Sequence, residues 1–442
     1  MRNKSITITL LFIFMLGGFN LMAQLPSDEP LECIITNKKM GLRDRVTKSI
    51  VIPCEYDVIE EGGENLFKVK TNGLWGVVDK SGKILIAPKF NELGTFGVDG
   101  LARAKTGDKW GFINIKGSFV IPEKYEDVVA FNKDGICPVK MNGKWGVIDK
   151  TQKVLIDMKY DAPLFFNNGY ARAYRDGLYG IVNVNGTETV PCQYKDAWSI
   201  YDNLMNVKNG DKWGFIDVHG NVVIPFKYNR TYSEFINNQI GLEDNAGSYL
   251  VCSDSRVIAS FPGESIYTMR GNGDGDKETY YALRIKVAPF KKYVVNSKGE
   301  RINSTNYQDV GFCYSNNMIN VKMNDKWGFL NTNGTMALDY KYDDVSLVHS
   351  GKGIAVKIGD KWGMIDLAGN TIIPFEYDII DQNYVFSKLI KNGKMGALNN
   401  NAEMMLPVKY DDISYPDSRL GYFPVKLDGK EGYADFYGND TF

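Results

Sequence analysis

The chain has 442 residues, of which 44% are hydrophobic and 24% charged, and its formal net charge at pH 7 is −1. This balance can fill a large core, but it gives no excess of positive charge to attract phosphate backbones, so nucleic acid is excluded as an expected partner. The six cysteines are widely spread and form no CxxC pair, which argues against a metal centre. We expect buried thiols, with Cys33 and Cys54 as the first candidates if a disulfide forms.

The first 23 residues have the composition of a secretory signal peptide. Arg2 and Lys4 precede an apolar run, residues 5–19, that is too short to span the ~30 Å hydrocarbon core of a bilayer. Ala23 then offers a small residue for cleavage before Gln24. No later stretch is apolar enough for a transmembrane segment. We therefore expect an exported chain that is periplasmic, displayed on the outer surface or secreted.

From residue 24 onward, one unit of about 35 residues recurs. The heptapeptide Gly-Asp-Lys-Trp-Gly-Phe-Ile begins at Gly107 and again at Gly210. We call the position of its Trp the slot. The slot recurs twelve times, at Met40, Trp75, Trp110, Trp145, Tyr179, Trp213, Tyr249, Tyr293, Trp327, Trp362, Met395 and Glu431. Such a period is the signature of a repeat architecture, whereas a catalytic motif is normally needed once.

Turn residues divide each unit into short β-strands. An Asn-Gly or Asp-Gly pair, such as 142–143, precedes many slots and suits the positive φ angles of a type I′ hairpin turn. Asp or Asn stands four residues after the slot in ten of twelve units, and Gly usually follows three residues later, as at Asp79 and Gly82. We expect three antiparallel strands per unit, plus a short fourth segment led by the aromatic fifteen residues after the slot.

The Gly that follows the slot in ten of twelve units indicates a close approach. Gly weakens a strand unless something must come near its backbone. Residues two and three after the slot are apolar, as at Val147 and Ile148, so both faces of this strand are expected to be buried. We predict that an aromatic ring packs over this Gly. The pairs assigned to the repeated core are Trp75 and Gly76, Trp110 and Gly111, Trp145 and Gly146, Trp213 and Gly214, Trp327 and Gly328, and Trp362 and Gly363.

The pattern Lys-Trp-Gly-x-Ile-Asp-x-x-Gly-x-x-x-Ile-Pro-x-x-Tyr-Asp is nearly complete from Lys144, Lys212 and Lys361. It resembles the WG (KWG) repeat of bacterial exported and surface proteins, and the resemblance covers essentially the whole mature chain. It implies a repeat fold in the cell envelope and brings no catalytic or ligand-binding residues with it. The pattern is interrupted over 229–312, where Tyr249-Leu250 and Tyr293-Val294 replace Trp-Gly.

The chain is therefore predicted to be all-β, with about twelve tandem β-meander repeats. We divide it into the signal peptide (1–23), an N-terminal part of the array (24–228), degenerate repeats with an insertion (229–312) and a C-terminal part (313–442). An open, curved, solenoid-like array is favoured, because 35 residues are few for a propeller blade and both ends look like free edges. A closed, propeller-like ring is the alternative.

Few residues outside the repeat offer chemistry. His219 falls in an expected exposed turn, and neither it nor His349 is set in a recognisable catalytic triad. The acid-rich loop 271–278 has spacing reminiscent of a calcium loop, but Lys277 stands where an EF-hand needs Gly, so a flexible insertion is the better interpretation. Alternation of Asp with Asn four residues after the slot favours turns over metal ligands. We expect no metal, no cofactor and no enzymatic activity.

Trp198 and Tyr201 are aromatic residues that the repeat does not explain, since the other six tryptophans occupy slots. Aromatics in a connecting loop suit stacking on a sugar or gripping a partner, although capping the core of their own unit is the simpler role. We expect a scaffold that binds a protein or cell-surface glycan. The alternative is a glycan-binding or glycan-processing protein with carboxylates between repeats, for which hydrolysis needs two acids ~5 to 9.5 Å apart, one with a raised pKa.

Overall fold

The computed structural model describes residues 31–442, apart from 232–234, 236–237, 270–279, 286–290, 314–317, 347–352, 383–385 and 418–419. The predicted signal peptide, the acid-rich loop 271–278 and His349 lie outside the described residues. The described part contains strands and no helix, which confirms the all-β prediction. It follows that this part holds no helix that is long and apolar enough to cross a membrane.

The strands of the first six sheets have the following bounds: β1 Leu31–Thr36, β2 Lys39–Asp44, β3 Ile50–Tyr56; β4 Val58–Gly63, β5 Leu66–Thr71, β6 Leu74–Asp79, β7 Ile84–Phe90; β8 Glu92–Leu93, β9 Leu101–Thr106, β10 Lys109–Asn114, β11 Phe119–Tyr125; β12 Asp127–Val128, β13 Ile136–Met141, β14 Lys144–Asp149, β15 Val154–Tyr160; β16 Tyr170–Arg175, β17 Leu178–Asn183, β18 Glu188–Tyr194; β19 Asp196–Tyr201, β20 Leu204–Asn209, β21 Lys212–Asp217, β22 Val222–Tyr228.

The strands of the remaining sheets have the following bounds: β23 Arg230–Thr231, β24 Gln239–Glu243, β25 Gly247–Cys252, β26 Val257–Pro262; β27 Glu264–Met269, β28 Tyr280–Ile285, β29 Lys292–Val295; β30 Asp309–Cys313, β31 Met318–Met323, β32 Lys326–Asn331, β33 Met336–Tyr342; β34 Asp344–Val345, β35 Ile354–Ile358, β36 Lys361–Ile365, β37 Thr371–Tyr377; β38 Ile379–Gln382, β39 Ser387–Lys391, β40 Lys394–Leu398, β41 Met404–Tyr410; β42 Asp412–Ile413, β43 Tyr422–Leu427, β44 Lys430–Asp435.

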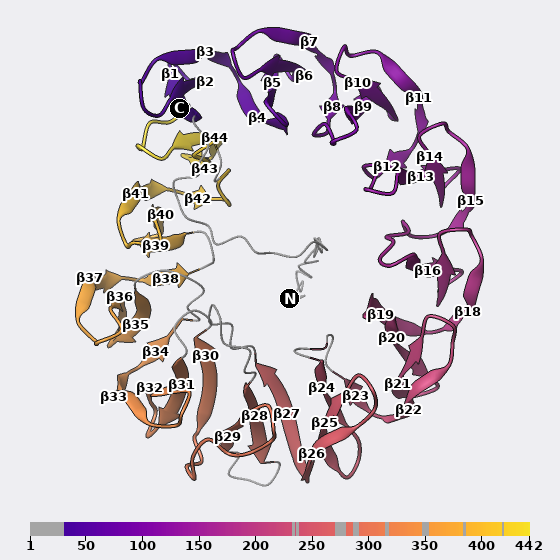
Figure 1. Ribbon diagram of the computed structural model, residues 1–442. Coiled ribbons are helices and arrows are strands. Elements are labelled where there is room, and N and C mark those ends of the chain that lie inside the picture. Colours follow the sequence, from indigo (N-terminus) through magenta and orange to yellow (C-terminus); the bar gives the residue numbers. More distant parts are fainter. Residues whose placement is uncertain are drawn as a thin grey trace, which may run out of the picture.

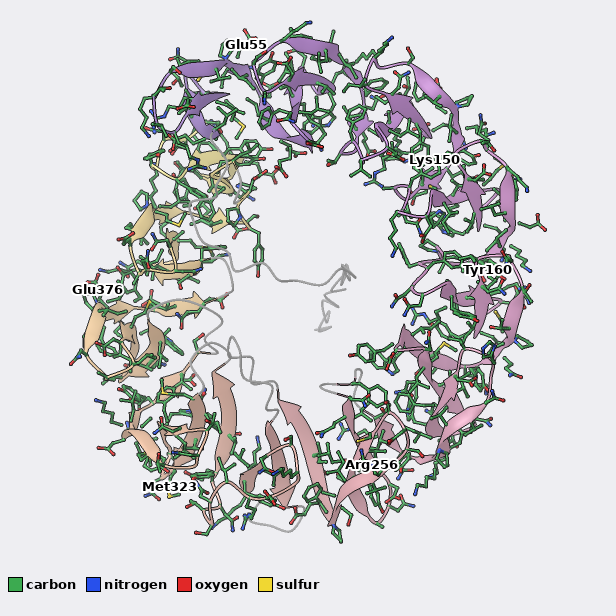
Figure 2. All side chains as sticks on the ribbon, in the orientation of Figure 1. Glu55, Lys150, Tyr160, Arg256, Met323 and Glu376 are labelled. Carbon is green, nitrogen blue, oxygen red and sulfur yellow. The ribbon has the colours of Figure 1, made fainter. Side chains whose placement is uncertain are left out.

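In the described residues these strands form twelve small antiparallel sheets, which follow one another around a ring in chain order (Figure 1). Within most sheets the strand order is also the chain order, so each sheet is a meander. The first strand of a sheet lies at the inner edge of the ring, and long strands such as β7, β11 and β15 run along the outer edge (Figure 1). Side chains occupy the spaces between neighbouring sheets, while Glu55 and Glu376 lie at the outer margin (Figure 2).

The fourth sheet, β12 to β15, shows how the turn residues act. Asn142 and Gly143, with φ angles of 52° and 75°, connect β13 to β14. The Oδ1 atom of Asp149 accepts hydrogen bonds from the backbone N–H groups of Thr151 (2.8 Å) and Lys153 (3.0 Å) in the next turn. The predicted role of the repeated Asp or Asn as a turn former is confirmed at this position, and a carboxylate so engaged needs no metal.

The short fourth segment belongs to the following sheet, which corrects the predicted boundary of the unit. Tyr125 ends β11 and lies opposite the slot residue Trp110, so the aromatic completes the third long strand of its own sheet. The two residues of β12 that follow pair instead with β13 of the next sheet. The sequence pattern could not show this, because strand pairing partners are set by the path of the chain in space.

Gly146, the residue after the slot Trp145, faces a β-bulge. Trp145 pairs with Tyr160, but Val147 pairs with Ile156, so the partner strand carries extra residues opposite Gly146. A Cβ atom at Gly146 would lie 2.5 Å from the carbonyl oxygen of Ile156. The close approach was predicted correctly. At Gly146 the backbone of the next strand makes it, and no aromatic ring is among the nearest atoms. At Gly214, Gly328 and Gly363 the predicted ring is present as well, because atoms of Phe226, Tyr340 and Phe375 lie 2.7, 3.1 and 2.9 Å from the Cβ position.

The degenerate unit around Tyr249 supports this explanation. Leu250 replaces the usual Gly there, and the pairing of Tyr249 with Ser260 continues without a shift to the pairing of Leu250 with Ala259. The bulge is thus absent at the position where a side chain would collide with it. Tyr249 still lies on the second long strand of its sheet, as Trp145 does.

The hydrophobic core is a series of clusters shared by adjacent sheets. Trp145 and Tyr160 of the fourth sheet pack with Leu164 and Ala171, which belong to the fifth unit. Trp110 and Trp145 are each only 7% exposed, the other four slot tryptophans are half-buried, and the Gly after each of the six is buried. Stability therefore depends on contacts between neighbours as well as within each sheet.

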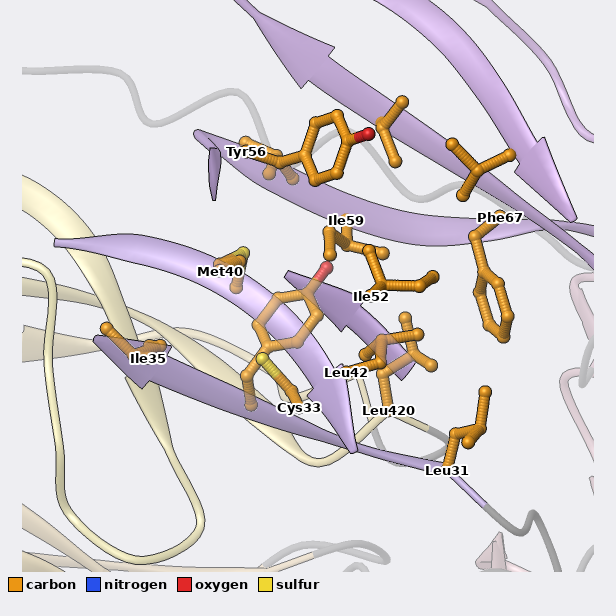
Figure 3. Packing of buried hydrophobic residues seen from close by; sticks show 14 residues of the cluster. Leu31, Cys33, Ile35, Met40, Leu42, Ile52, Tyr56, Ile59, Phe67 and Leu420 are labelled. Carbon is orange, nitrogen blue, oxygen red and sulfur yellow. The ribbon is translucent and has the colours of Figure 1, made fainter. Parts of the chain in front are cut away.

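The last sheet packs against the first, so the ring is closed. The backbone N–H of Cys33 in β1 donates to the carbonyl oxygen of Leu420, which precedes β43, at 2.7 Å. Leu420 and Tyr422 share a buried apolar cluster with Leu31 and Leu42 of the first sheet (Figure 3). The tandem repeat prediction is confirmed, and the closed ring, the alternative to the favoured open array, is the arrangement observed.

Candidate functional site

The Asp that ends the repeat pattern joins two neighbouring units. Asp161 accepts a hydrogen bond from Lys144, the residue before the slot, and its other oxygen accepts from the backbone N–H of Asp176 in the next unit at 2.7 Å. We call this arrangement the Lys–Asp clamp. It recurs at Asp57, Asp343, Asp378 and Asp411.

The clamp also explains the charge state of these carboxyl groups. The Lys144 ammonium, and then the backbone N–H of Asp176, hold the pKa of Asp161 below its usual value. The pKa of the other four clamp carboxyls is lowered with the corresponding Lys as the main cause. The Lys and the Asp of the clamp are the first and last residues of the repeat pattern, yet the sequence did not show that they contact each other. The recurrence of this Lys and this Asp in the same units was the signal that could have predicted the contact.

A second set of cations joins three of the sheets to the inner strand of the next one. Arg103 donates to the carbonyl oxygen of Val128 at 3.1 Å, and Arg172 donates to that of Ala197 at 2.9 Å. Lys68 reaches Leu93 in the same way. These side chains satisfy backbone acceptors at the inner edge, which reduces its capacity to pair with a foreign strand.

The seam between the last and first sheets contains a buried carboxylate. The Glu32 side chain is 4% exposed and accepts hydrogen bonds from Arg43 (2.7 Å), Lys48 (3.0 Å) and the hydroxyl of Tyr437 in the last unit. Burial raises the pKa of Glu32, but the hydrogen bonds from Tyr437, Arg43 and Lys48 outweigh this effect and the pKa is lowered overall. Glu32 is therefore charged and fully engaged near neutral pH.

A cavity of about 230 Å³ lies beside this carboxylate, lined by residues that include Cys33, Met405, Phe436 and Tyr437. Burial raises the pKa of the Cys33 thiol well above its usual range, so the thiolate needed for nucleophilic attack is scarce. Cys33 is a free thiol, as are Cys54, Cys137, Cys192 and Cys252. The candidate disulfide between Cys33 and Cys54 is thus absent from this structure. The cavity at the seam is lined by residues that join the last sheet to the first, and its thiol is not activated.

Trp198 and Tyr201 lie at the inner edge of the ring, on β19. This strand has six residues, whereas the inner strands β12 and β23 have two. β19 forms a hairpin with β20 through Asp202 and Asn203, whose φ angles of 46° and 61° fit a type I′ turn. Sequence analysis had placed the two aromatics in a connecting loop, and the structure corrects this.

β19 carries a β-bulge next to the two aromatic residues. In β19, Ala197 pairs with Val207 and Ile200 pairs with Met205, so two residues of β19 are unpaired between them. Trp198 is 41% exposed and Tyr201 is 48% exposed, while Ala197 is buried and Ile200 half-buried. Both aromatic side chains are thus exposed on the strand that carries the bulge.

A buried ring supports the exposed pair from behind. The Tyr201 ring stacks on Phe235 with centroids 6.1 Å apart and an interplanar angle of 19°. Phe235 is 4% exposed and packs edge-on against Phe215 in the core. Phe235 was not identified from the sequence, because it lies in an irregular segment of the degenerate region. These contacts give a defined aromatic surface, which we call the aromatic pair: Trp198 and Tyr201.

Other chemistry is sparse in the described residues. His219 is exposed, as predicted, and its ring lies edge-on to Tyr170 at 5.9 Å. The described part of the chain holds no group of three or more potential metal ligands. Each described carboxyl group with a displaced pKa has it displaced downward, from Glu32 to Asp411.

The fold defines a class of protein, an all-β ring of tandem meander repeats. The family model for the WG containing repeat matches residues 44–75, 75–110, 110–145, 145–179, 179–213, 213–238, 327–362, 362–384 and 395–430. These segments make up well over half of the chain, so the chain belongs to the WG-repeat family. The unmatched stretch from 239 to 326 contains Tyr249 and Tyr293, where Trp-Gly is replaced. No curated protein sequence matches the chain significantly.

Several solved structures resemble the chain at low identity. A crystal structure of the eukaryotic initiation factor is 14% identical, with 94% of this chain and 95% of that chain covered and a TM-score of 0.33. The extracellular domain of a putative one component system from B. thetaiotaomicron is 10% identical, with coverages of 90% and 77% and a TM-score of 0.25. PorZ, a surface component of the type-IX secretion system of Porphyromonas gingivalis, is 9% identical, with coverages of 85% and 64% and a TM-score of 0.22. These TM-scores are too low to support a functional argument.

Proposed function

We propose that this WG-repeat protein is an exported, non-enzymatic binding protein that holds its partner at the aromatic pair. The observation that carries the proposal is the exposure of both Trp198 and Tyr201 on one extended inner strand. The repeated aromatics contribute to the core between sheets, whereas these two rings lie outside that pattern. Large aromatic side chains kept exposed at a defined position are typical of binding surfaces.

The coupling between units supports a scaffold role. Lys–Asp clamps, cations that reach the next inner strand and shared apolar clusters each join neighbouring sheets. A ring held in this way keeps a surface at its inner edge in a fixed position, which lowers the entropic cost of binding a partner there. No movement of the ring is needed for this role.

The titration behaviour of the side chains gives no support to the glycan-processing alternative. A general acid in a glycosidase needs a raised pKa, and the displaced carboxyl pKa values of the described residues are lowered. The buried thiol of Cys137 has its pKa raised to about 12, which does not suit a nucleophile. We therefore propose binding without chemistry.

Export is the part of the proposal that rests on residues 1–23 and on the cell-envelope context expected from the WG-repeat resemblance. We expect N-terminal sequencing of the protein recovered from its producing cells to begin at Gln24. A sequence that begins at Met1 would contradict export through signal cleavage.

Site-specific photocrosslinking tests the binding role. A photoreactive amino acid at position 201 should give an adduct with a cell-envelope component, and competition with the unlabelled protein should remove this adduct. The matched control carries the same group at Tyr415, which is 68% exposed in another unit. Equal labelling at both positions, or none at 201, would reject the aromatic pair as the binding surface.

A further inference from the structure

We propose that the ligand of the aromatic pair is a neutral glycan, whose sugar rings stack on Trp198 and Tyr201. This inference rests on the proposed binding function and specifies its chemistry. One face of a pyranose ring presents C–H groups with partial positive charge, which are attracted to the negative face of an aromatic ring. A flat, exposed aromatic side chain flanked by hydrogen-bonding groups is therefore suited to a sugar.

The exposed area of the aromatic pair is sufficient for a sugar. An aromatic side chain offers at most about 150–250 Å² of surface, so exposures of 41% and 48% leave roughly 100 Å² on each ring. A stable protein interface needs about 800 Å² from each partner. The aromatic pair supplies about a quarter of this area, so a folded protein would have to bury further surface, whereas one or two sugar rings could be covered by the pair alone.

Contacts also hold the Tyr201 ring and the backbone beside Trp198 in place before any ligand arrives. Tyr201 stacks on the buried Phe235, and the hydrogen bond from Arg172 to the carbonyl of Ala197 fixes the backbone next to Trp198. Weakly binding ligands such as sugars gain most from a surface whose side chains lose little freedom on binding. A loop that had to order itself around the sugar would lose this advantage.

The polar surroundings suit hydroxyl groups that are not charged. Asp202 and Asn203 follow Tyr201 directly in the exposed turn, and the exposed Asp196 begins the strand. Carboxylate and amide oxygens accept hydrogen bonds from sugar hydroxyls. Lys195, Arg172 and Lys208 accompany Asp196 and Asp202, so the surroundings offer no strong charge of one sign to select a charged polymer. The ligand class is thus a neutral glycan.

The test uses the full mature protein and three defined probes: cellohexaose, maltohexaose and chitohexaose. Titration followed by calorimetry and by Trp fluorescence should show saturable binding of at least one probe in the millimolar range or tighter. Trp198→Ala should weaken this binding by at least about tenfold, and Trp198→Phe, which keeps a flat ring, should restore most of it. Tyr415→Ala serves as the matched control and should bind as the unmodified protein does.

Thermal melts of each variant show whether a loss of binding reflects unfolding, and Trp198→Ala should melt within a few degrees of the parent protein. Absence of binding by all three hexasaccharides would overturn the glycan inference. If the crosslinker at position 201 then captured a protein, the binding function would stand with a different ligand class. If neither experiment gave a signal, both proposals would fail, so the two failures are distinguishable. Equal binding by the parent and Trp198→Ala would also reject the site.

Discussion

The junction between the fourth and fifth sheets and the seam between the last and first sheets close neighbouring units by different chemistry. At the first junction, Asp161 accepts hydrogen bonds from Lys144 of its own unit and from the backbone of Asp176 in the next. At the seam, Glu32 accepts from Arg43, Lys48 and Tyr437, and the backbone of Cys33 donates to Leu420.

The difference follows from how the chain connects the sheets. At an internal junction, the two residues that continue from one unit form the inner strand of the next, so a local pattern of Lys, Asp and turn residues can act at every step. The chain does not run from β44 into β1, so the seam needs contacts between residues about 400 positions apart, as between Glu32 and Tyr437. A repeated motif can encode the first kind of junction and cannot encode the second.

The largest effect should come from removing the core of an internal junction. Trp145→Ala should lower the free energy of unfolding by about 3–5 kcal/mol, because the indole is 7% exposed and packs in a cluster shared by two sheets. Denaturant unfolding measures this loss. Trp198→Ala is the matched control, and a larger loss for Trp198 than for Trp145 would contradict the division between core and surface tryptophans.

The next effect concerns the bulge that accompanies each Trp-Gly pair. Gly146→Ala should cost about 1–3 kcal/mol, because the new Cβ would lie 2.5 Å from a backbone oxygen that cannot move independently of its strand. Gly311→Ala is the control, since the nearest atom there is a side-chain nitrogen of Asn320 at 3.2 Å. Equal costs in denaturant unfolding would show that the bulge does not account for the repeated Gly.

The seam can be weakened without touching an internal junction. Tyr437→Phe removes the hydroxyl that donates to Glu32 and should cost about 1–2 kcal/mol, in the range for a hydrogen bond to a charged group. Hydrogen exchange should accelerate at the amide of Cys33, which donates across the seam, and stay unchanged at Asp176. Uniform acceleration at both amides would mean that the seam does not open as a separate unit.

The smallest effect for a single substitution should come from the exposed Lys–Asp clamps, and pH shows their sum. The pKa of each of the five clamp carboxyls is lowered from its usual value of 3.8. Their contribution to stability is therefore fully present above the unfolded pKa near 3.8 and is lost as pH falls through the folded values. Thermal melts should show this loss below pH 4. Asp161→Asn should flatten that part of the profile slightly, and the exposed Asp157→Asn should leave it unchanged.

Much of the local structure could be predicted from single residues. The turn at Asn142 and Gly143 needs positive φ angles that these residues adopt readily, and Asp149 closes the next turn with its own side chain. The need for Gly146 was also readable, since a Gly inside a strand implies a close approach. Its partner was not, because a bulge in another strand leaves no distinct mark on the sequence.

The aromatic pair could be predicted only in part. Trp198 was recognised because it stands outside a repeat that accounts for the other tryptophans. Its position on a strand, the bulge beside it and the support of Tyr201 by Phe235 were not visible. Each depends on which strands pair and on contacts between different sheets.

The sequence by itself determined the β-strand class, the number of units and the two recurrent turns on either side of the slot strand, because these follow from φ preferences and side-chain hydrogen bonds within a few residues. Only the tertiary structure decided that the ring closes and with which sheet each inner strand pairs. Closure depends on the small rotation between neighbouring sheets, accumulated over the whole chain until Leu420 meets Cys33. No short segment contains the accumulated rotation, so closure can be recognised only when all the sheets are in place.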